Sequence, residues 1–203
     1  MDRNRPGWIL TSRGQRFWPL DPGVDDVAIE DIAHALSLTC RFTGHCREFY
    51  SVAEHSVHVS RLVQMWTARY GNNHYVRVAT MQALLHDGSE AFLADVARPV
   101  KPGLATYIDI ERRLQAVIEA KLLPKAPFGH HHDYVKAIVK YADDVMLATE
   151  AKAIMPYTGG WEIDVDSLAL PGYELALWPP KAAEFQFLQR YHEFNNPNWL
   201  PTE

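Results

Sequence analysis

Apolar residues recur along most of this chain at the three- and four-residue intervals of amphipathic α-helices, with polar residues between them. The pattern predicts helices inside residues 25–42 and over 51–70, 74–93, 106–123, 133–154 and 181–194. Gly71, Pro99 and Pro124 mark places where a helix is expected to end. The pattern therefore predicts an all-α protein, a single helical bundle of five to seven helices.

Both flanks of the helical region follow other patterns. Residues 7–20 alternate apolar and polar positions about a glycine, which predicts a small N-terminal β-hairpin. Residues 156–180 are rich in Pro and Gly and contain Trp161 and Trp178, so we expect an extended connection packed on the surface through its aromatics. With 203 residues the chain suits one domain. Its parts are a hairpin (1–24), a helical core (25–155) and a C-terminal extension with the last helix (156–203).

Composition narrows the class of protein. The formal net charge of −5 argues against a nucleic-acid partner, because a basic surface normally supplies that affinity. No apolar run approaches the ~18 residues of a membrane span, and the first residues form no apolar leader, so we expect a cytoplasmic protein without a membrane partner. Cys40 and Cys46 do not form a CxxC pair, and we expect two reduced thiols.

Candidate chemistry concentrates in the stretch ALLHDGSE, residues 83–90. His86 and Asp87 end an apolar helical run, and Glu90 follows at a spacing that a continuing helix would bring to the same face. An adjacent His-Asp pair is common by chance and needs partners. Upstream, AEHS supplies His55; downstream, VKYADDV places two aspartates in an apolar helix, where carboxylates are costly unless they are paired or bind a cation.

Two imidazoles and two carboxylates would form a mixed nitrogen and oxygen site. Such a site suits Mn, Fe, Co, Ni or Zn rather than Ca or Mg. Four protein ligands leave coordination positions for a water and a phosphate oxygen. The residues alone thus predict a site for one divalent transition metal.

The order His55, His86-Asp87 and Asp143 resembles the H…HD…D signature of the HD-domain metal-dependent phosphohydrolases. The stretch ALLHDGSEAFLADVARPVK is similar to the corresponding segment of small bacterial 5′-deoxynucleotidases and phage dATP triphosphohydrolases in that superfamily. The resemblance covers roughly residues 41–150. It implies an HD-domain bundle, a deoxynucleotide substrate and a homo-oligomer.

The resemblance also implies roles for individual residues. The metal ligands would be His55, His86, Asp87 and Asp143; Asp143 is preferred to Asp144 because Lys140 precedes it by three residues, as in the family. Glu90 matches an acidic residue that activates the attacking water or relays its proton, so Asp87 and Glu90 are the catalytic candidates. The expected substrate-binding residues are Arg41 and Phe42 near sugar and base, Asp95 in the pocket, and Lys101 and Lys140 at the phosphates.

Several alternatives stay open. Lys140 could simply pair with Asp143 or Asp144 along its own helix, and Phe42 could belong to the core. The residues outside this set, His34, His45, His58 and the run His130–His132, are expected to be ordinary histidines, with His58 on the helix surface or at the rim of the site.

The substrate is also open between two phosphates. Two lysines beyond the metal favour a triphosphate, so the favoured reaction converts dATP to deoxyadenosine and triphosphate, with additional Mg²⁺ on the substrate phosphates. A 5′-deoxynucleotidase acting on monophosphates is the alternative. A catalytically silent nucleotide-binding regulator is an alternative of another class, and the net charge disfavours a nuclease.

Overall fold

The computed structural model describes residues 6–70, 73–124 and 132–195. Across these ranges, six helices have ten residues or more. They are α1 (Ile29–Leu38), α2 (Val52–Thr67), α3 (Asn73–Leu85), α5 (Ala105–Leu122), α6 (His132–Ile154) and α8 (Pro180–Asn195). Shorter are α4 (Glu90–Leu93), α7 (Val165–Leu168) and the 3-10 turns Val24–Asp26, Phe42–Gly44, Ala68–Tyr70 and Lys101–Gly103. The prediction of an all-α bundle is confirmed.

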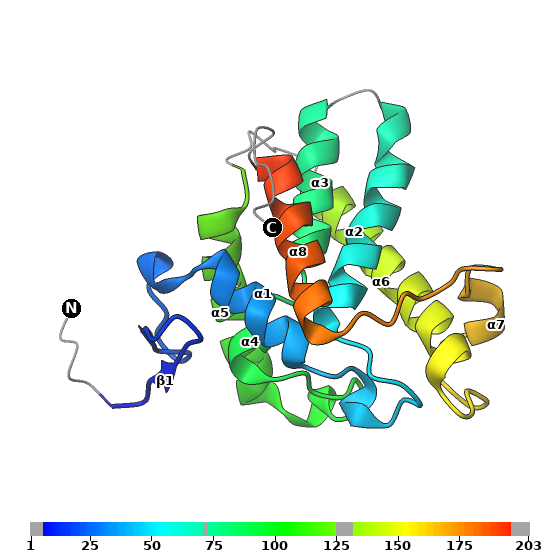
Figure 1. Cartoon of the computed structure of the whole chain (residues 1–203), viewed down its shortest axis with the longest axis horizontal. Coiled ribbons are helices and arrows are strands. Elements are labelled where there is room, and N and C mark those ends of the chain that lie inside the picture. Colours follow the sequence, from blue (N-terminus) through cyan, green and yellow to red (C-terminus); the bar gives the residue numbers. More distant parts are fainter. Residues whose placement is uncertain (1–5, 71–72, 125–131, 196–203) are drawn as a thin grey trace.

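The central helix of the bundle is α2. Ser51 caps its N-terminus by accepting a hydrogen bond from the Glu54 amide at 3.1 Å. Twelve of its sixteen residues are buried, because α1, α3, α6 and α8 all pack on it. Figure 1 shows α2 among α3, α6 and α8. No helix in the described ranges has the length and apolar character needed to cross a membrane.

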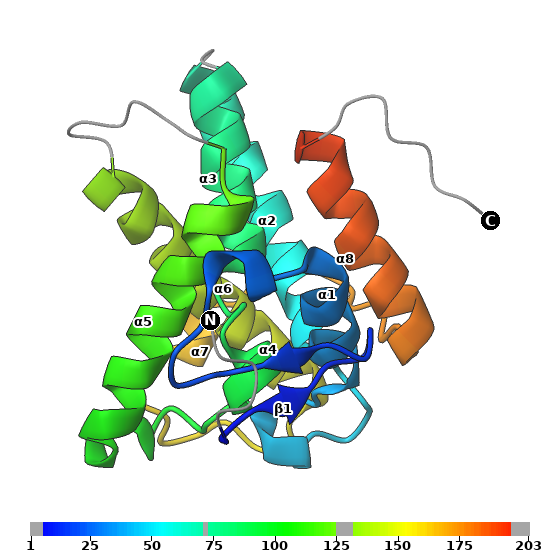
Figure 2. The same cartoon turned by 90° about the vertical axis from the view of Figure 1, so that its left-hand side faces the viewer.

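The predicted N-terminal hairpin is present and is anchored to the bundle. Strand β1 (Ile9–Leu10) pairs antiparallel with β2 (Arg16–Phe17), below α1 and beside α4 in Figure 2. Phe17 is fully buried and stacks on Phe92 of α4, with ring centroids 3.9 Å apart. Asp31 of α1 accepts hydrogen bonds from the Ser12 hydroxyl at 2.8 Å and from the Arg13 amide at 3.1 Å. The hairpin therefore closes one side of the core.

The predicted helix over 74–93 is interrupted, which corrects the sequence analysis. Helix α3 ends at Leu85, a turn follows, and α4 begins at Glu90. The Gly88 amide donates to the Leu85 carbonyl at 2.9 Å, and a Cβ on Gly88 would lie 3.0 Å from that oxygen and 3.3 Å from Ile118. The turn therefore packs tightly against α5, and His86 and Asp87 lie in this turn rather than on a helix face.

A smaller correction concerns α5. The spacing of apolar residues along α5 predicts that Ile108 lies on the buried face with Leu114, Val117, Ile118 and Leu122, but Ile108 is exposed. Burial on α5 begins at Leu114, so only its second half contacts the core.

The C-terminal extension crosses the bundle before α8. Its residues 169–179, which we name the strap, pack on α2 through Trp178 and Tyr173. The Trp178 ring stacks on the His58 ring at 5.6 Å between centroids, and the Tyr173 hydroxyl lies 2.7 Å from His58 Nδ1. The strap thus covers one side of α2 with aromatic side chains, as the sequence predicts for Trp178.

Candidate metal centre

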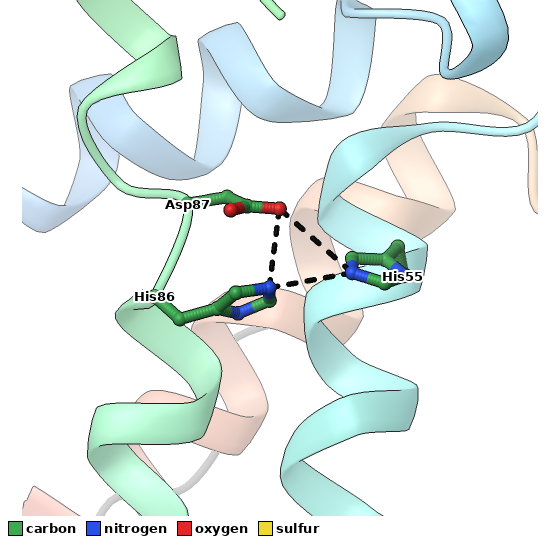
Figure 3. A group of neighbouring side chains, drawn as sticks. All are labelled: His55, His86 and Asp87. Atoms are coloured by element: carbon green, nitrogen blue, oxygen red, sulfur yellow. Dashed lines mark hydrogen bonds and ion pairs between the residues drawn. The ribbon is translucent and has the colours of Figure 1, made fainter. Parts of the chain in front are cut away.

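Three predicted ligands meet where α2 faces the turn after α3. His55 lies on the first turn of α2, and its Nε2 is 3.3 Å from His86 Nε2 and 3.8 Å from Asp87 Oδ2. His86 Nε2 is 3.2 Å from the same Asp87 oxygen. Figure 3 shows the two rings and the carboxylate directed toward one another. The three side chains form a group whose donor atoms could hold one ion.

The fourth predicted ligand, Asp143, reaches the same point from α6. Its Oδ1 is 3.3 Å from His55 Nε2 and 4.0 Å from His86 Nε2. Asp144 instead forms an ion pair with Arg98 at 2.8 Å and another with Lys140. The structure therefore brings Asp143, rather than its neighbour, to the two imidazoles.

The donor atoms fit a single transition-metal ion. Ligand bonds of about 2.0–2.2 Å separate two donors on one ion by roughly 3 to 3.5 Å, at right-angled or tetrahedral geometry. The measured separations of 3.2–4.0 Å approach that spacing. Two neutral imidazoles and two carboxylates also match the donor preference of Mn, Fe, Co, Ni and Zn.

Both imidazoles are oriented by a hydrogen bond at the other ring nitrogen. His86 Nδ1 lies 2.8 Å from the Ala83 carbonyl oxygen, to which it donates. His55 Nδ1 lies 2.6 Å from Glu150 Oε1. A proton held at Nδ1 leaves the lone pair on Nε2, so both rings turn a metal-binding nitrogen toward the centre.

Glu150 is a site residue that the sequence analysis missed. It is fully buried on α6 and also accepts hydrogen bonds from the Tyr50 hydroxyl at 2.9 Å and from Arg41 Nε at 3.1 Å. Burial opposes its ionisation, but the charges of His55 and Arg41 hold its pKa below the ordinary value. Its signal in the sequence was a glutamate seven residues after Asp143 on the same helix, hence on the same face.

The charges of the centre act strongly on His55. Burial and the nearby Arg41 charge disfavour its protonation, yet Glu150 and Asp143 together raise its pKa to about 9. The pKa values of Asp87 and Asp143 are lowered despite burial, mainly by the two histidines. A cation must therefore compete with a proton for His55, so its binding releases protons.

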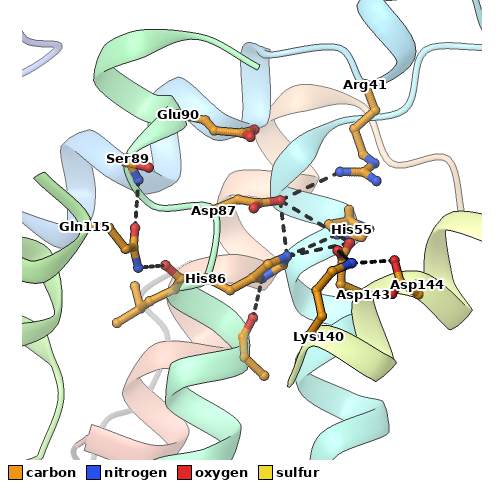
Figure 4. Close-up of polar contacts among 12 residues, drawn as sticks. Arg41, His55, His86, Asp87, Ser89, Glu90, Gln115, Lys140, Asp143 and Asp144 are labelled. Carbon is orange, nitrogen blue, oxygen red and sulfur yellow. Dashed lines mark hydrogen bonds and ion pairs between the residues drawn. The ribbon is translucent and has the colours of Figure 1, made fainter. Parts of the chain in front are cut away.

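Four cationic side chains lie around the predicted ligands and Glu90: Arg41, Arg98, Lys101 and Lys140. Figure 4 shows Arg41 and Lys140. Arg41, which is buried, reaches Asp87 at 3.7 Å, and Lys140 Nζ lies 3.3 Å from Asp143. Lys101 Nζ lies 3.6 Å from Glu90 and 2.9 Å from Glu111. Lys140 thus pairs with Asp143 and Asp144 along its own helix, which is the alternative that the sequence left open.

Arg98 is a second residue that the sequence analysis missed. Its guanidinium donates to Asp143 at 3.1 Å and to Asp144 at 2.8 Å. Its signal was its place in ADVARPVK, between two residues that were selected.

Glu90 lies at the start of α4 in a desolvated position. It is 5% exposed, and its Oε2 has no hydrogen-bond partner within the described part of the chain. Burial, followed by repulsion from Asp87 and Asp95, raises its pKa to about 10. In the metal-free protein Glu90 is therefore a neutral acid at pH 7, which can hold a proton beside the centre.

The remaining predicted substrate residues lie around Arg41. Phe42 is half-buried outside the hydrophobic core, and its ring lies 5.6 Å from the Arg41 guanidinium carbon and 6.2 Å from the Trp161 ring. Asp95 is half-buried. Burial raises the pKa of its carboxyl group; the Arg41 charge opposes this rise and the Asp87 charge adds to it. Arg41 and Phe42 thus form an adjacent pair, of which Arg41 contacts the predicted ligand Asp87.

His58 is buried, at 3% exposure, so its predicted place on the surface or rim is wrong. The strap covers this side of α2: Tyr173 contacts His58 Nδ1, and Glu54 lies 3.5 Å from Nε2. Glu54 is fully buried and accepts the backbone amides of Leu177 and Trp178 at 2.8 and 2.6 Å. His58 therefore belongs to a polar cluster that fastens the strap, which we name the strap clamp.

Of the other histidines that the sequence analysis considered, His34 and His45 have ordinary surroundings. His34 is half-exposed and pairs with Glu184 at 3.2 Å, and His45 is exposed after the Phe42–Gly44 turn. His130 and His131 lie outside the described residues, as does the helix end expected at Gly71.

Comparison with other proteins places the chain in a family of uncharacterized proteins. No family model matches it. It is 33% identical over 190 residues to the uncharacterized protein YfdR of Escherichia coli K12, across 93% of this chain and 96% of YfdR. It is also 33% identical over 198 residues to the uncharacterized protein RCAP_rcc00048 of Rhodobacter capsulatus, across 91% of this chain and 94% of that protein. Because the similarity to YfdR extends over nearly the whole of both chains, the protein belongs to the YfdR family.

Proposed function

We propose that this chain is an HD-domain phosphohydrolase that uses one divalent transition metal to convert dATP to deoxyadenosine and triphosphate. The observation that carries the proposal is the convergence of four donor atoms, from His55, His86, Asp87 and Asp143, among cationic side chains. A set of buried acids and imidazoles beside cationic side chains suits an anionic substrate held at a metal.

The reaction has simple requirements. A water oxygen adds to the α-phosphorus, the bond from that phosphorus to the 5′ oxygen breaks, and the 5′ oxygen takes up a proton. When bound, the cation supplies Lewis acidity toward a phosphoryl oxygen and toward the attacking water. Glu90, buried and holding a proton, relays a proton between the water and the leaving 5′ oxygen.

Cationic side chains bind the phosphates in this proposal. Arg41, Arg98 and Lys140 contact carboxylates that a metal would engage. Once those carboxylates bind the cation, the three side chains can donate to phosphate oxygens instead. Several such donors around one centre favour a substrate with several phosphates.

A 5′-deoxynucleotidase is the second candidate. The pairs of Lys101 with Glu111 and of Lys140 with Asp144 engage both lysines within the protein. This favours a smaller substrate, such as dAMP, held mainly by Arg41 and the metal.

The deciding experiment is a nucleotide panel with identified products. The protein is loaded with Mn, Co, Fe, Ni or Zn, with Mg and Ca as controls, and given deoxynucleoside tri- and monophosphates. We expect deoxyadenosine and triphosphate from dATP. Inorganic phosphate from dAMP without triphosphate from dATP would identify the nucleotidase. Nucleotide binding without turnover would identify a silent regulator, and digestion of single-stranded DNA a nuclease.

Neighbouring aspartates provide a matched control for the metal assignment. Asp143→Ala is expected to lose metal and activity together, whereas Asp144→Ala keeps the metal, because of the two only Asp143 contacts the imidazoles.

A homo-oligomer in the cytoplasm is also part of the proposal. Light scattering measures the number of subunits.

A further inference from the structure

Two thiols flank the loop that carries Arg41 and Phe42. Cys40 Sγ and Cys46 Sγ lie 3.6 Å apart, and both side chains are partly exposed. The Cys46 thiol also donates to the Arg41 carbonyl oxygen at 3.7 Å. The pair therefore touches the backbone of a residue that contacts both Asp87 and Glu150.

The loop between the thiols is fixed at its ends and strained at its tip. Cys40 pairs with Ser51 in an isolated β-bridge, and the Arg47 amide donates to the Ile154 carbonyl at 2.9 Å. Between them, Phe42, Thr43 and Gly44 have φ angles of 53°, 53° and 76°. Left-handed backbone at the two residues other than glycine is costly, so a change of conformation at this tip would release that cost.

We propose that Cys40 and Cys46 form a reversible disulfide that regulates substrate binding through the Arg41 loop. The regulatory effect rests on the proposed function; formation of the bond does not. The oxidant is a small-molecule disulfide such as oxidised glutathione.

The exchange is balanced in two steps. The Cys40 thiolate attacks one sulfur of the small disulfide, whose S–S bond breaks and releases one thiol. The Cys46 thiolate then attacks the Cys40 sulfur, and the second thiol leaves. Two electrons and two protons pass from the protein to the small molecules. Burial and the Cys40 neighbour raise the pKa of the Cys46 thiol.

Bond formation removes a contact with the Arg41 backbone. The sulfur separation falls from 3.6 Å to about 2.05 Å, and the thiol contact with the Arg41 carbonyl is lost. The four predicted metal ligands lie outside residues 40–46, so nucleotide affinity should change while metal retention does not.

The test treats the metal-loaded protein with oxidised glutathione and then with a reductant. We expect a linked Cys40–Cys46 peptide lighter by two hydrogen atoms, a KM raised about fivefold or more, unchanged metal content, and full recovery on reduction. Cys40→Ser and Cys46→Ser should keep the KM of the reduced protein under oxidation.

Three results would overturn the proposal: absence of the intramolecular bond, a bond with unchanged KM, or loss of metal on oxidation. Failure of the proposed function is distinguishable, because it would appear as a lack of turnover in the reduced protein. In that case peptide mapping still tests the bond, and hydrogen exchange over residues 41–50 tests whether the loop moves.

Discussion

Helix α2 carries two histidines three residues apart, His55 and His58, and each lies beside a buried glutamate. His55 contacts Glu150 at 2.6 Å on the side facing α6, and His58 lies 3.5 Å from Glu54 on the side facing the strap. The same two residue types, with both histidines on one helix, thus occur in the candidate metal centre and in the strap clamp.

The two clusters differ in how completely their polar atoms are satisfied. In the strap clamp, both ring nitrogens of His58 have partners, and both carboxylate oxygens of Glu54 accept backbone amides. In the metal centre, His55 Nε2 faces another imidazole nitrogen and two acids. A closed cluster serves the fold, whereas converging lone pairs and negative charges are the arrangement expected of the metal site that we propose.

The sharpest test of this difference is Asp87→Ala. Because Asp87 contributes charge and a donor atom to the centre, we expect loss of metal and an activity lower by at least about a thousandfold. Elemental analysis and product formation measure both. Retained metal would remove Asp87 from the ligand set.

Glu90→Ala separates proton transfer from metal binding. Glu90 lies beside the centre and pairs with Lys101 rather than with either imidazole. We therefore expect the variant to keep its full metal content and to have a rate lower by about 10²–10³. Metal analysis alongside kcat checks this. Metal loss here would mean that Glu90 is a ligand.

Glu54→Ala probes the closed cluster. The amides of Leu177 and Trp178 would lose their acceptor inside the protein, which should lower the free energy of unfolding by about 2–4 kcal/mol. Urea denaturation measures the loss. Metal affinity per folded molecule should stay the same, and a large drop in it would abolish the distinction between the clusters.

Glu150→Gln is the matched substitution in the open cluster. The amide keeps the shape but removes the charge that orients His55, so metal affinity should fall by about 10- to 100-fold. Competition with a chelator measures it. Unchanged affinity would make Glu150 a structural residue like Glu54.

The last prediction concerns how the free energy of unfolding of the metal-free protein changes with pH. The unfolded chain ionises Glu90 above its ordinary pKa of 4.5, whereas the folded, metal-free protein keeps the proton until about pH 10. Glu90 therefore lowers the free energy of unfolding increasingly as pH rises between these values. Glu90→Gln should therefore stabilise the metal-free protein at pH 8 and have little effect on its stability at pH 4. Equal gains at both pH values would contradict the buried acid.

The main helices and the predicted ligands could be found in the sequence because each has a local signal. Periodicity marks the buried side of α2, and the order of His55, His86-Asp87 and Asp143 marks the centre. The break after Leu85 had only a weak local signal, Gly88, because the close packing of that residue against Ile118, thirty residues later, is visible only in the folded chain.

Partners distant in the chain were beyond sequence reasoning. Glu150 meets His55 across 95 residues, and Arg98 meets Asp143 across 45. The burial of His58 depends on the strap, an irregular segment whose path follows no periodicity. A charged residue on a helix has many possible partners, and only the folded chain selects one.

The donors of the metal centre come from separate stretches of chain. His55 and His86 are 31 residues apart, and Asp143 belongs to a third helix. In an unfolded chain these groups are dispersed, so one ion bridging them would act as a reversible cross-link that closes long loops and favours the folded state alone. If the chain binds the metal as we propose, depletion of the metal would then raise the population of unfolded chain, which proteases cleave. The supply of one ion would set how long each molecule lasts.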